Sequence, residues 1–164
     1  MPFRRVTALV ALAATMALGL ATAGGGAAQG GSQTALFAHL RGANEVDARG
    51  RRGAGDGDGR GAFAAVVKNG RHFCFSLTVT GIGTPVGAHI HRGRAGRNGP
   101  IVVTFTHPPT GDPGVSGGCG DIDPAVLRAI RRRPRDYYVN VHTRGRPGGS
   151  VRGQLFRATS RQNR

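Results

Sequence analysis

The 164-residue chain contains no tryptophan, a single lysine and only eight acidic residues. Most of these carboxylates stand in turn or helix-cap contexts, so few remain that could form the carboxylate pairs used in general acid–base catalysis. A Gly-Lys-Ser/Thr phosphate-binding loop is also missing. Because no catalytic constellation is evident, the sequence predicts a non-enzymatic protein.

A hydrophobic run long enough to cross a bilayer is absent as well. The longest apolar stretch, Val6–Leu20, has about fifteen residues, whereas a spanning helix needs roughly 20. Two arginines precede this stretch, and an Ala-Thr-Ala tripeptide that ends at Ala23 follows it. The pattern is typical of a secretory signal peptide over residues 1–23, with cleavage as late as Ala28 as the alternative. We expect a secreted mature protein without a membrane span, which begins with a flexible linker over residues 24–33.

Cysteine is scarce too, since the chain has only Cys74 and Cys119. An even number of cysteines in an exported chain predicts a disulfide, because oxidising compartments let such bonds form and persist. Closing a loop of about 45 residues stabilises a fold by roughly 4 kcal/mol in the chain-entropy model. The alternative, a pair of metal-binding thiolates, lacks the Cys-x-x-Cys spacing typical of such sites.

Negative charge is outweighed by arginine, which gives the chain a formal net charge of +15. Such a surface attracts anionic partners, and we expect an anionic polymer of the cell envelope or the extracellular space. The arginines are spread from Arg41 to Arg164 without interleaved aromatics and outside any nucleic-acid-binding motif, so no specific nucleic-acid partner is expected. General surface charge without a dedicated polyanion site is the alternative interpretation.

The chain does have a succession of short β-rich segments punctuated by glycine. Asn69-Gly70 separates two of them, and Asn-Gly between β-rich runs is a strong hairpin signal. From Phe73 to Thr80 large apolar residues occupy every second position, as in a half-buried strand. The expected fold of residues 34–158 is all-β, an antiparallel, Greek-key-like β-sandwich or barrel of about seven strands with one short helix. The expected strands are Leu36–Leu40, Ala62–Lys68, His72–Thr80, Val86–His91, Ile101–Thr106, Tyr137–His142 and Ser150–Phe156.

The single expected helix begins after Asp123, which is a suitable N-cap, and has Pro124 at its first position. Pro134 ends it. Its apolar face consists of Val126, Leu127 and Ile130.

Two segments rich in glycine and aspartate, Gly50–Gly61 and Thr110–Gly120, are expected to be loops. A third glycine-rich segment, Gly93–Gly99, contains Arg94 and Arg97 and is interpreted either as an anion-binding loop or as a tight turn. Residues 159–164 are expected to form a disordered tail.

The most informative segment is Gly87–Gly93, which contains His89 and His91. In an extended strand these two side chains point to the same face. His142 follows Asn140 in a Tyr-Val-Asn-Val-His run, whose valines are expected to face the core and whose histidine faces outward. If the two strands are neighbours, three imidazoles meet on one face, which is the ligand number of a Zn or Cu site. Polar, hydrogen-bonding surface histidines are the alternative.

Several motifs follow one another within Leu36–Phe156. They are Leu40-Arg41-Gly42-Ala43-Asn44-Glu45-Val46, His89-Ile90-His91-Arg92-Gly93 with Gly96, Asn98-Gly99-Pro100 and Val102, and Tyr138–Thr143 with Pro147-Gly148-Gly149 and Arg152–Leu155. In this order they resemble one known family, the CHRD domain first described in chordin. The family usually has one or two prolines after the first motif, where this chain has Asp47-Ala48, a departure that affects only the shape of the first loop.

The resemblance implies a secreted β-rich module, here a non-enzymatic binding or cell-envelope protein of unknown ligand. The His-x-His strand is also similar to a copper-ligating strand of Cu/Zn superoxide dismutase, itself a β-sandwich. This similarity gives the alternative hypothesis, a Cu- or Zn-binding metalloprotein with a dismutase-like site at His89, His91 and His142. The chain lacks a convincing zinc-loop His/Asp set, so dismutase activity is implied by analogy alone.

Overall fold

The computed structural model describes residues 33–158. The expected signal peptide (1–23), the expected linker up to residue 32 and the expected tail (159–164) lie outside the described residues. Gln33, the last residue of the expected linker, is already the first residue of strand β1.

Within residues 33–158 the chain forms nine strands, one α-helix and two 3₁₀ turns. The strands are β1 (Gln33–Arg41), β2 (Arg60–Lys68), β3 (His72–Thr80), β4 (Pro85–Arg92), β5 (Ile101–Thr104), β6 (Gly114–Asp121), β7 (Tyr137–Thr143), β8 (Arg146–Gln154) and β9 (Phe156–Arg157). The helix is α1 (Pro124–Arg132), and the turns are η1 (Gly42–Asn44) and η2 (Pro134–Asp136).

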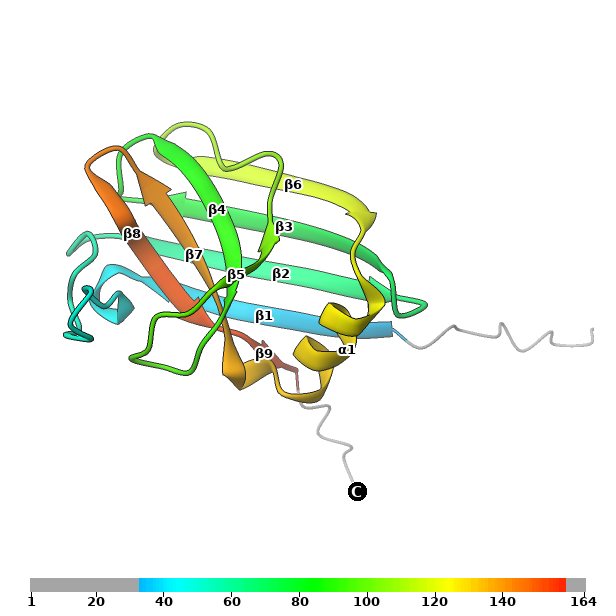
Figure 1. Cartoon of the computed structure of the whole chain (residues 1–164). Coiled ribbons are helices and arrows are strands. Elements are labelled where there is room, and N and C mark those ends of the chain that lie inside the picture. Colours follow the sequence, from blue (N-terminus) through cyan, green and yellow to red (C-terminus); the bar gives the residue numbers. More distant parts are fainter. Residues whose placement is uncertain (1–32, 159–164) are drawn as a thin grey trace, which may run out of the picture.

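All the strands belong to one antiparallel sheet with the order β5-β4-β7-β8-β1-β2-β3-β6, and β9 pairs with β1 beside this path. The sheet curls between β8 and β1, so that β5, β4, β7 and β8 form one layer and β1, β2, β3 and β6 the other (Figure 1). Three connections, β3–β4, β5–β6 and β6–β7, pass from one layer to the other, as in Greek-key sandwiches. The predicted all-β class is therefore confirmed, with nine strands in place of about seven.

The hairpin and the helix form where the sequence predicts them. Asn69 and Gly70 adopt positive φ angles of 51° and 71° and join β2 to β3. Asp123 caps α1, because its Oδ1 accepts a hydrogen bond of 2.7 Å from the backbone N–H of Ala125. Leu127 and Ile130 are fully buried on the apolar face of the helix.

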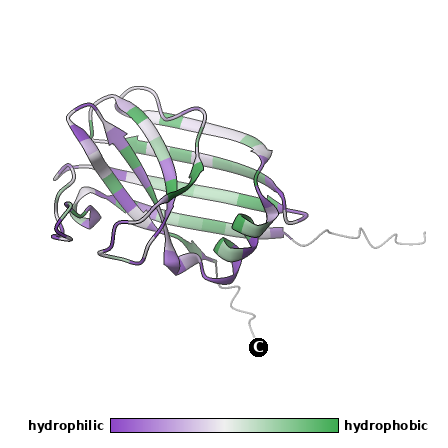
Figure 2. Ribbon diagram, in the orientation of Figure 1, coloured by the Kyte–Doolittle hydropathy of each residue, from purple (hydrophilic) through white to green (hydrophobic). Residues whose placement is uncertain are grey.

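The hydrophobic core fills the space between the two layers and is closed at one end by α1 (Figure 1). Apolar residues are concentrated on β1, β2 and β3 and on the inner side of α1 (Figure 2). Along β2 and β3 they alternate with more exposed residues, so burial of every second side chain defines the register there. The largest fully buried apolar side chains are Leu36, Leu40, Leu77, Ile90, Leu127, Ile130 and Leu155.

The predicted loop over Thr110–Gly120 is wrong in its second half, because Gly114–Asp121 forms β6 and pairs with β3. Half of the residues of β6 are glycine and the strand has no apolar alternation, so its strand character comes from its partner rather than from its own residues. A smaller correction concerns Ser150–Phe156. There the chain breaks into β8 and β9 at Leu155, whose N–H donates to the carbonyl of Tyr137.

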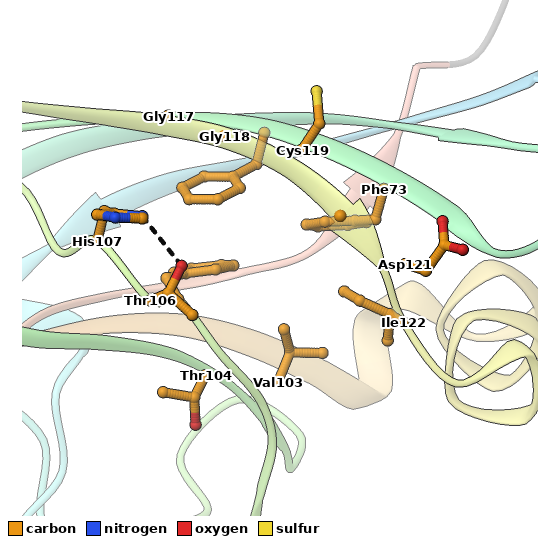
Figure 3. Close-up of a pocket in the computed structure, with 13 residues that line it drawn as sticks. Phe73, Val103, Thr104, Thr106, His107, Gly117, Gly118, Cys119, Asp121 and Ile122 are labelled. Carbon is orange, nitrogen blue, oxygen red and sulfur yellow. Dashed lines mark hydrogen bonds between the residues drawn. The ribbon is translucent and has the colours of Figure 1, made fainter.

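The glycines of β6 leave a hollow of about 310 Å³ between the two edges of the sheet, β5 and β6. Phe73, Phe75 and Phe105 line it, and the rings of Phe75 and Phe105 stack at 4.3 Å between centroids. A Cβ at Gly118 would lie 3.6 Å from the ring of Phe75, so this position would fill the hollow if it carried a side chain. Cys119 points away from the rings (Figure 3).

No helix in residues 33–158 has both the length and the apolar character needed to cross a membrane.

Candidate metal centre

The three predicted histidines lie on two neighbouring strands. His89 and His91 are on β4, His142 is on β7, and the register places His89 opposite Asn140 and Gly87 opposite His142. The side chains that alternate with these histidines, Ala88, Ile90, Val139 and Val141, are fully buried in the core. The predicted parity is thus confirmed, because the histidines point away from the core.

The face that carries the histidines is nevertheless partly covered, because His91 is buried and His89 and His142 are half-buried, which corrects the expectation of freely exposed histidines. His91 is 9% exposed and Asn140 only 2% exposed. Two loops, residues 42–59 and 93–100, fold over this face and are tied together where the side-chain amide of Asn98 donates to the carbonyl of Asp47 at 3.1 Å. The sequence gives no periodic signal for such loop coverage.

The three imidazoles converge on one point. One ring nitrogen of each histidine lies within 4.8 Å of the corresponding nitrogens of the other two. The ring centroids of His89 and His142 are 5.0 Å apart, and those of His89 and His91 are 5.6 Å apart. A Zn²⁺ ion binds imidazole nitrogen at about 2.0–2.1 Å. The three nitrogens therefore form a group that could hold one ion.

Hydrogen bonds fix which nitrogen of two of the rings is free. Nδ1 of His91 donates to the carbonyl of Gly99 at 2.9 Å, and Nδ1 of His142 donates to the carbonyl of Pro147 at 2.9 Å. Because Nδ1 carries the proton, Nε2 of each ring holds a free lone pair. Both Nε2 atoms and Nδ1 of His89 are buried and have no hydrogen-bond partner among residues 33–158. Histidine ligands of metals commonly have this arrangement, with the second nitrogen bonded to a carbonyl.

Burial also keeps the cluster uncharged. It lowers the pKa of His89 to about 4, with smaller contributions from His142 and His91. Burial is likewise the main reason that the pKa values of His91 and His142 are lowered. The imidazoles are therefore neutral at pH 7, which is the form that binds metals.

Behind His91 lies a buried group of polar side chains that begins with Tyr138 and Arg152. Its residues belong to the sequence motifs, but composition and spacing did not predict that they would be buried together. The ring of Tyr138 stacks on His91 at 4.8 Å with an interplanar angle of 7°, and the guanidinium of Arg152 lies 3.3 Å from the centre of the Tyr138 ring. Arg152 also donates to Oδ1 of Asn98 at 3.0 Å and to the carbonyl of Arg97. It thus holds the loop that carries Gly99, the hydrogen-bond partner of His91.

Glu45 completes this group and is 1% exposed. Asn140 donates to its Oε1 at 3.3 Å. Burial raises the pKa of Glu45 from 4.5 to about 7, although the charge of Arg152 and the bond from Asn140 lower it in part. Glu45 belongs to the first CHRD-like motif, but the motif alone does not indicate a buried carboxylate.

The raised pKa predicts a specific pH dependence of stability. The unfolded chain releases the Glu45 proton near pH 4.5 and the folded chain near pH 7, so the contribution of Glu45 to stability is lost as pH rises between these values. Glu45→Gln keeps a neutral acceptor at all pH values. Relative to the wild type, its unfolding free energy should rise by about 3 kcal/mol from pH 4.5 to pH 7.5. Urea denaturation of both proteins at four pH values measures the difference, in which the contributions of the histidines cancel. A difference that stays constant with pH would contradict the assignment.

The two cysteines form the predicted disulfide, Cys74–Cys119, between directly opposed residues of β3 and β6. His72 lies close to them and binds Asp121 through Nδ1 at 3.1 Å. His72, Cys74 and Cys119 thus form a second cluster of possible metal-ligand types, but both sulfur atoms are in the disulfide, so this cluster presents no thiolates.

The Gly93–Gly99 loop forms a tight turn, the second of its two interpretations. Arg94 pairs with Asp136 at 2.8 Å, and the N–H of Arg97 donates to the carbonyl of Arg94 at 3.0 Å.

The segment Gly114–Gly118 matches the letters of the Gly-x-Ser-x-Gly nucleophile elbow. Its Ser116 lies inside β6 rather than on a strand-to-helix turn, and its hydroxyl donates to the carbonyl of His107.

The fold and the site together define a small, disulfide-linked, all-β module of two strand layers, with a histidine cluster on the loop-covered face of one layer that points away from the core. The chain belongs to the CHRD domain family, whose family model matches residues 36–155. This match confirms the resemblance carried by the motifs. No curated protein matches the chain.

Proposed function

We propose that this CHRD module acts outside the cytoplasm as a binding protein for a transition-metal ion, Cu or Zn, held by His89, His91 and His142. The observation that carries the proposal is the convergence of three imidazoles, one ring nitrogen of each within 4.8 Å of the others, in a cluster where each ring has a buried nitrogen without a hydrogen-bond partner. The disulfide and the CHRD family support the extracytoplasmic location.

The energetics favour a bound ion over the alternative of hydrogen-bonding histidines. A buried nitrogen without a partner costs about 1–3 kcal/mol, and each of the three rings of this cluster has one. Histidines that served only the packing of the sheet would have both ring nitrogens paired or exposed to water. A metal ion would satisfy all three at once.

The donor set indicates the class of metal. Three neutral imidazoles suit Zn and Cu, whereas Ca²⁺ and Mg²⁺ require oxygen ligands. Such an ion would supply Lewis-acid chemistry, or redox chemistry in the case of copper. The residues of this chain would orient the ligands: the carbonyls of Gly99 and Pro147 fix two rings, and the stacked Tyr138 holds the plane of His91.

Titration of the mature protein, purified without a His-tag, tests the proposal. We expect one equivalent of Zn²⁺ or Cu²⁺ per chain by elemental analysis, and loss of that equivalent in the double variant His89→Ala/His91→Ala. Less than about 0.2 equivalents in the wild type, unchanged in the double variant, would overturn metal binding. A superoxide assay of the copper-loaded protein separates the binding role from the dismutase alternative.

A further inference from the structure

The helix α1 and the adjoining end of the sheet enclose a second concave surface, unrelated to the histidines. It is a hollow of about 350 Å³ between α1, the last residue of β4 and the start of β7. Its floor on the helix side consists of two small residues, Ala125 and Ala129. Four arginines surround the floor, and we call this surface the arginine hollow. They are Arg92, Arg128, Arg132 and Arg133.

The spacing of the sequence creates this arrangement. Ala125, Ala129 and Arg132 follow one another at helical intervals of four and three residues, and Arg128 lies four residues before Arg132 on the same side of α1. Arg92 faces them from β4, where it pairs with Tyr137 of β7. Arginines from two different elements therefore line one hollow.

The positive charge of the hollow is not neutralised by the described part of the chain. None of its four arginines takes part in a salt bridge within residues 33–158. The one acidic residue at the hollow, Asp136, is paired with Arg94 at 2.8 Å. A concave surface with charge of one sign focuses the electric field and attracts ligands of the opposite sign.

We propose that the arginine hollow binds an anionic polysaccharide, with the guanidinium groups bridging sulfate, phosphate or carboxylate groups on neighbouring sugars. Guanidinium forks bind such groups through two parallel hydrogen bonds. A nucleic acid fits less well, because single-strand binding relies on exposed aromatic rings for base stacking. Tyr137, the aromatic residue at the hollow, is only 7% exposed.

The test compares two variants that lose the same charge. Arg128→Gln/Arg132→Gln removes two arginines of the hollow. Arg49→Gln/Arg144→Gln removes two exposed arginines that do not line it and that form no salt bridge within the described residues. The probe is a heparin hexasaccharide, titrated by calorimetry at 150 mM NaCl, and circular dichroism checks that each variant is folded.

We expect the first variant to bind the hexasaccharide at least about tenfold more weakly than the wild type, and the control variant to lose less than about twofold. An equal loss in both variants would show that binding reflects net charge alone and would overturn the proposal. So would wild-type affinity in the first variant. A single-stranded oligonucleotide of the same charge is titrated in parallel. Equal or tighter binding of it, with the same dependence on Arg128 and Arg132, would overturn the choice of polysaccharide. The result does not depend on the metal, since the hollow and the histidines share no residue.

Discussion

Replacing His91 by alanine is expected to lower the affinity for Zn²⁺ by more than about 100-fold. Loss of a residue that merely orients a ligand typically weakens metal binding about 10–100-fold, and loss of a ligand itself should exceed this range. His91 is the most buried of the three histidines, and both its Gly99 hydrogen bond and its Tyr138 stack fix the ring in one orientation. Competition with a chromophoric chelator measures the change.

His39→Ala is the matched control. His39 is an exposed histidine on β1 that contacts the ring of Phe156, and it lies outside the cluster. Its removal should change the affinity for Zn²⁺ by less than about twofold. Wild-type affinity in folded His91→Ala protein, or an equal loss in His39→Ala, would place the binding site elsewhere.

The sequence predicted those parts of the fold that depend on local patterns. A few adjacent residues are enough to indicate where the chain turns or which side of a strand is buried. Examples are the alternation along β3, the Asn69-Gly70 turn and the Asp123 cap. For the same reason the parity of His89 and His91 was predicted. That β4 and β7 would be neighbours was not, because their pairing is decided by connections between layers rather than by either strand alone.

The buried group behind His91 escaped prediction for a related physical reason. Arg152 and Glu45 are charged residues, and charged residues are usually exposed. Their burial requires the loops over residues 42–59 and 93–100 to close over the sheet, and those loops are held by contacts between residues far apart in the chain. A glycine-rich loop sequence shows that the chain can turn, but it does not show what the loop will cover.

Strand β6 is the clearest case of a segment whose conformation is determined by its neighbours and not by its own sequence. Of its residues, Val115 carries the one large apolar side chain, and it is 65% exposed. Burial of side chains therefore contributes little to holding β6 in place. Backbone pairing with β3 and the Cys74–Cys119 bond are its main contacts, and β6 in turn borders the Phe73 and Phe75 rings. Polar contacts add to them: the Ser116 hydroxyl donates to the carbonyl of His107, and Asp121 pairs with Arg71 and His72.

Removal of the disulfide in Cys74→Ala/Cys119→Ala should consequently lower the unfolding free energy by about 4 kcal/mol, the chain-entropy value for a 45-residue loop. For a domain of this size the melting temperature should fall by roughly 15 °C. Denaturation in guanidinium chloride measures the first quantity and calorimetry the second. Both cysteines are replaced together so that no free thiol remains.

The loss should also be localised, because β6 has so few contacts of its own. Hydrogen exchange at the β6 amides should accelerate more than exchange on β4 and β7, where fully buried side chains such as Ile90 and Val139 hold the strands. Zn²⁺ binding below the melting temperature should remain at the wild-type level, since the histidines lie on β4 and β7 and not on β3 or β6. A loss of stability under about 1 kcal/mol, with unchanged exchange in β6, would show that the disulfide is not needed to hold this strand.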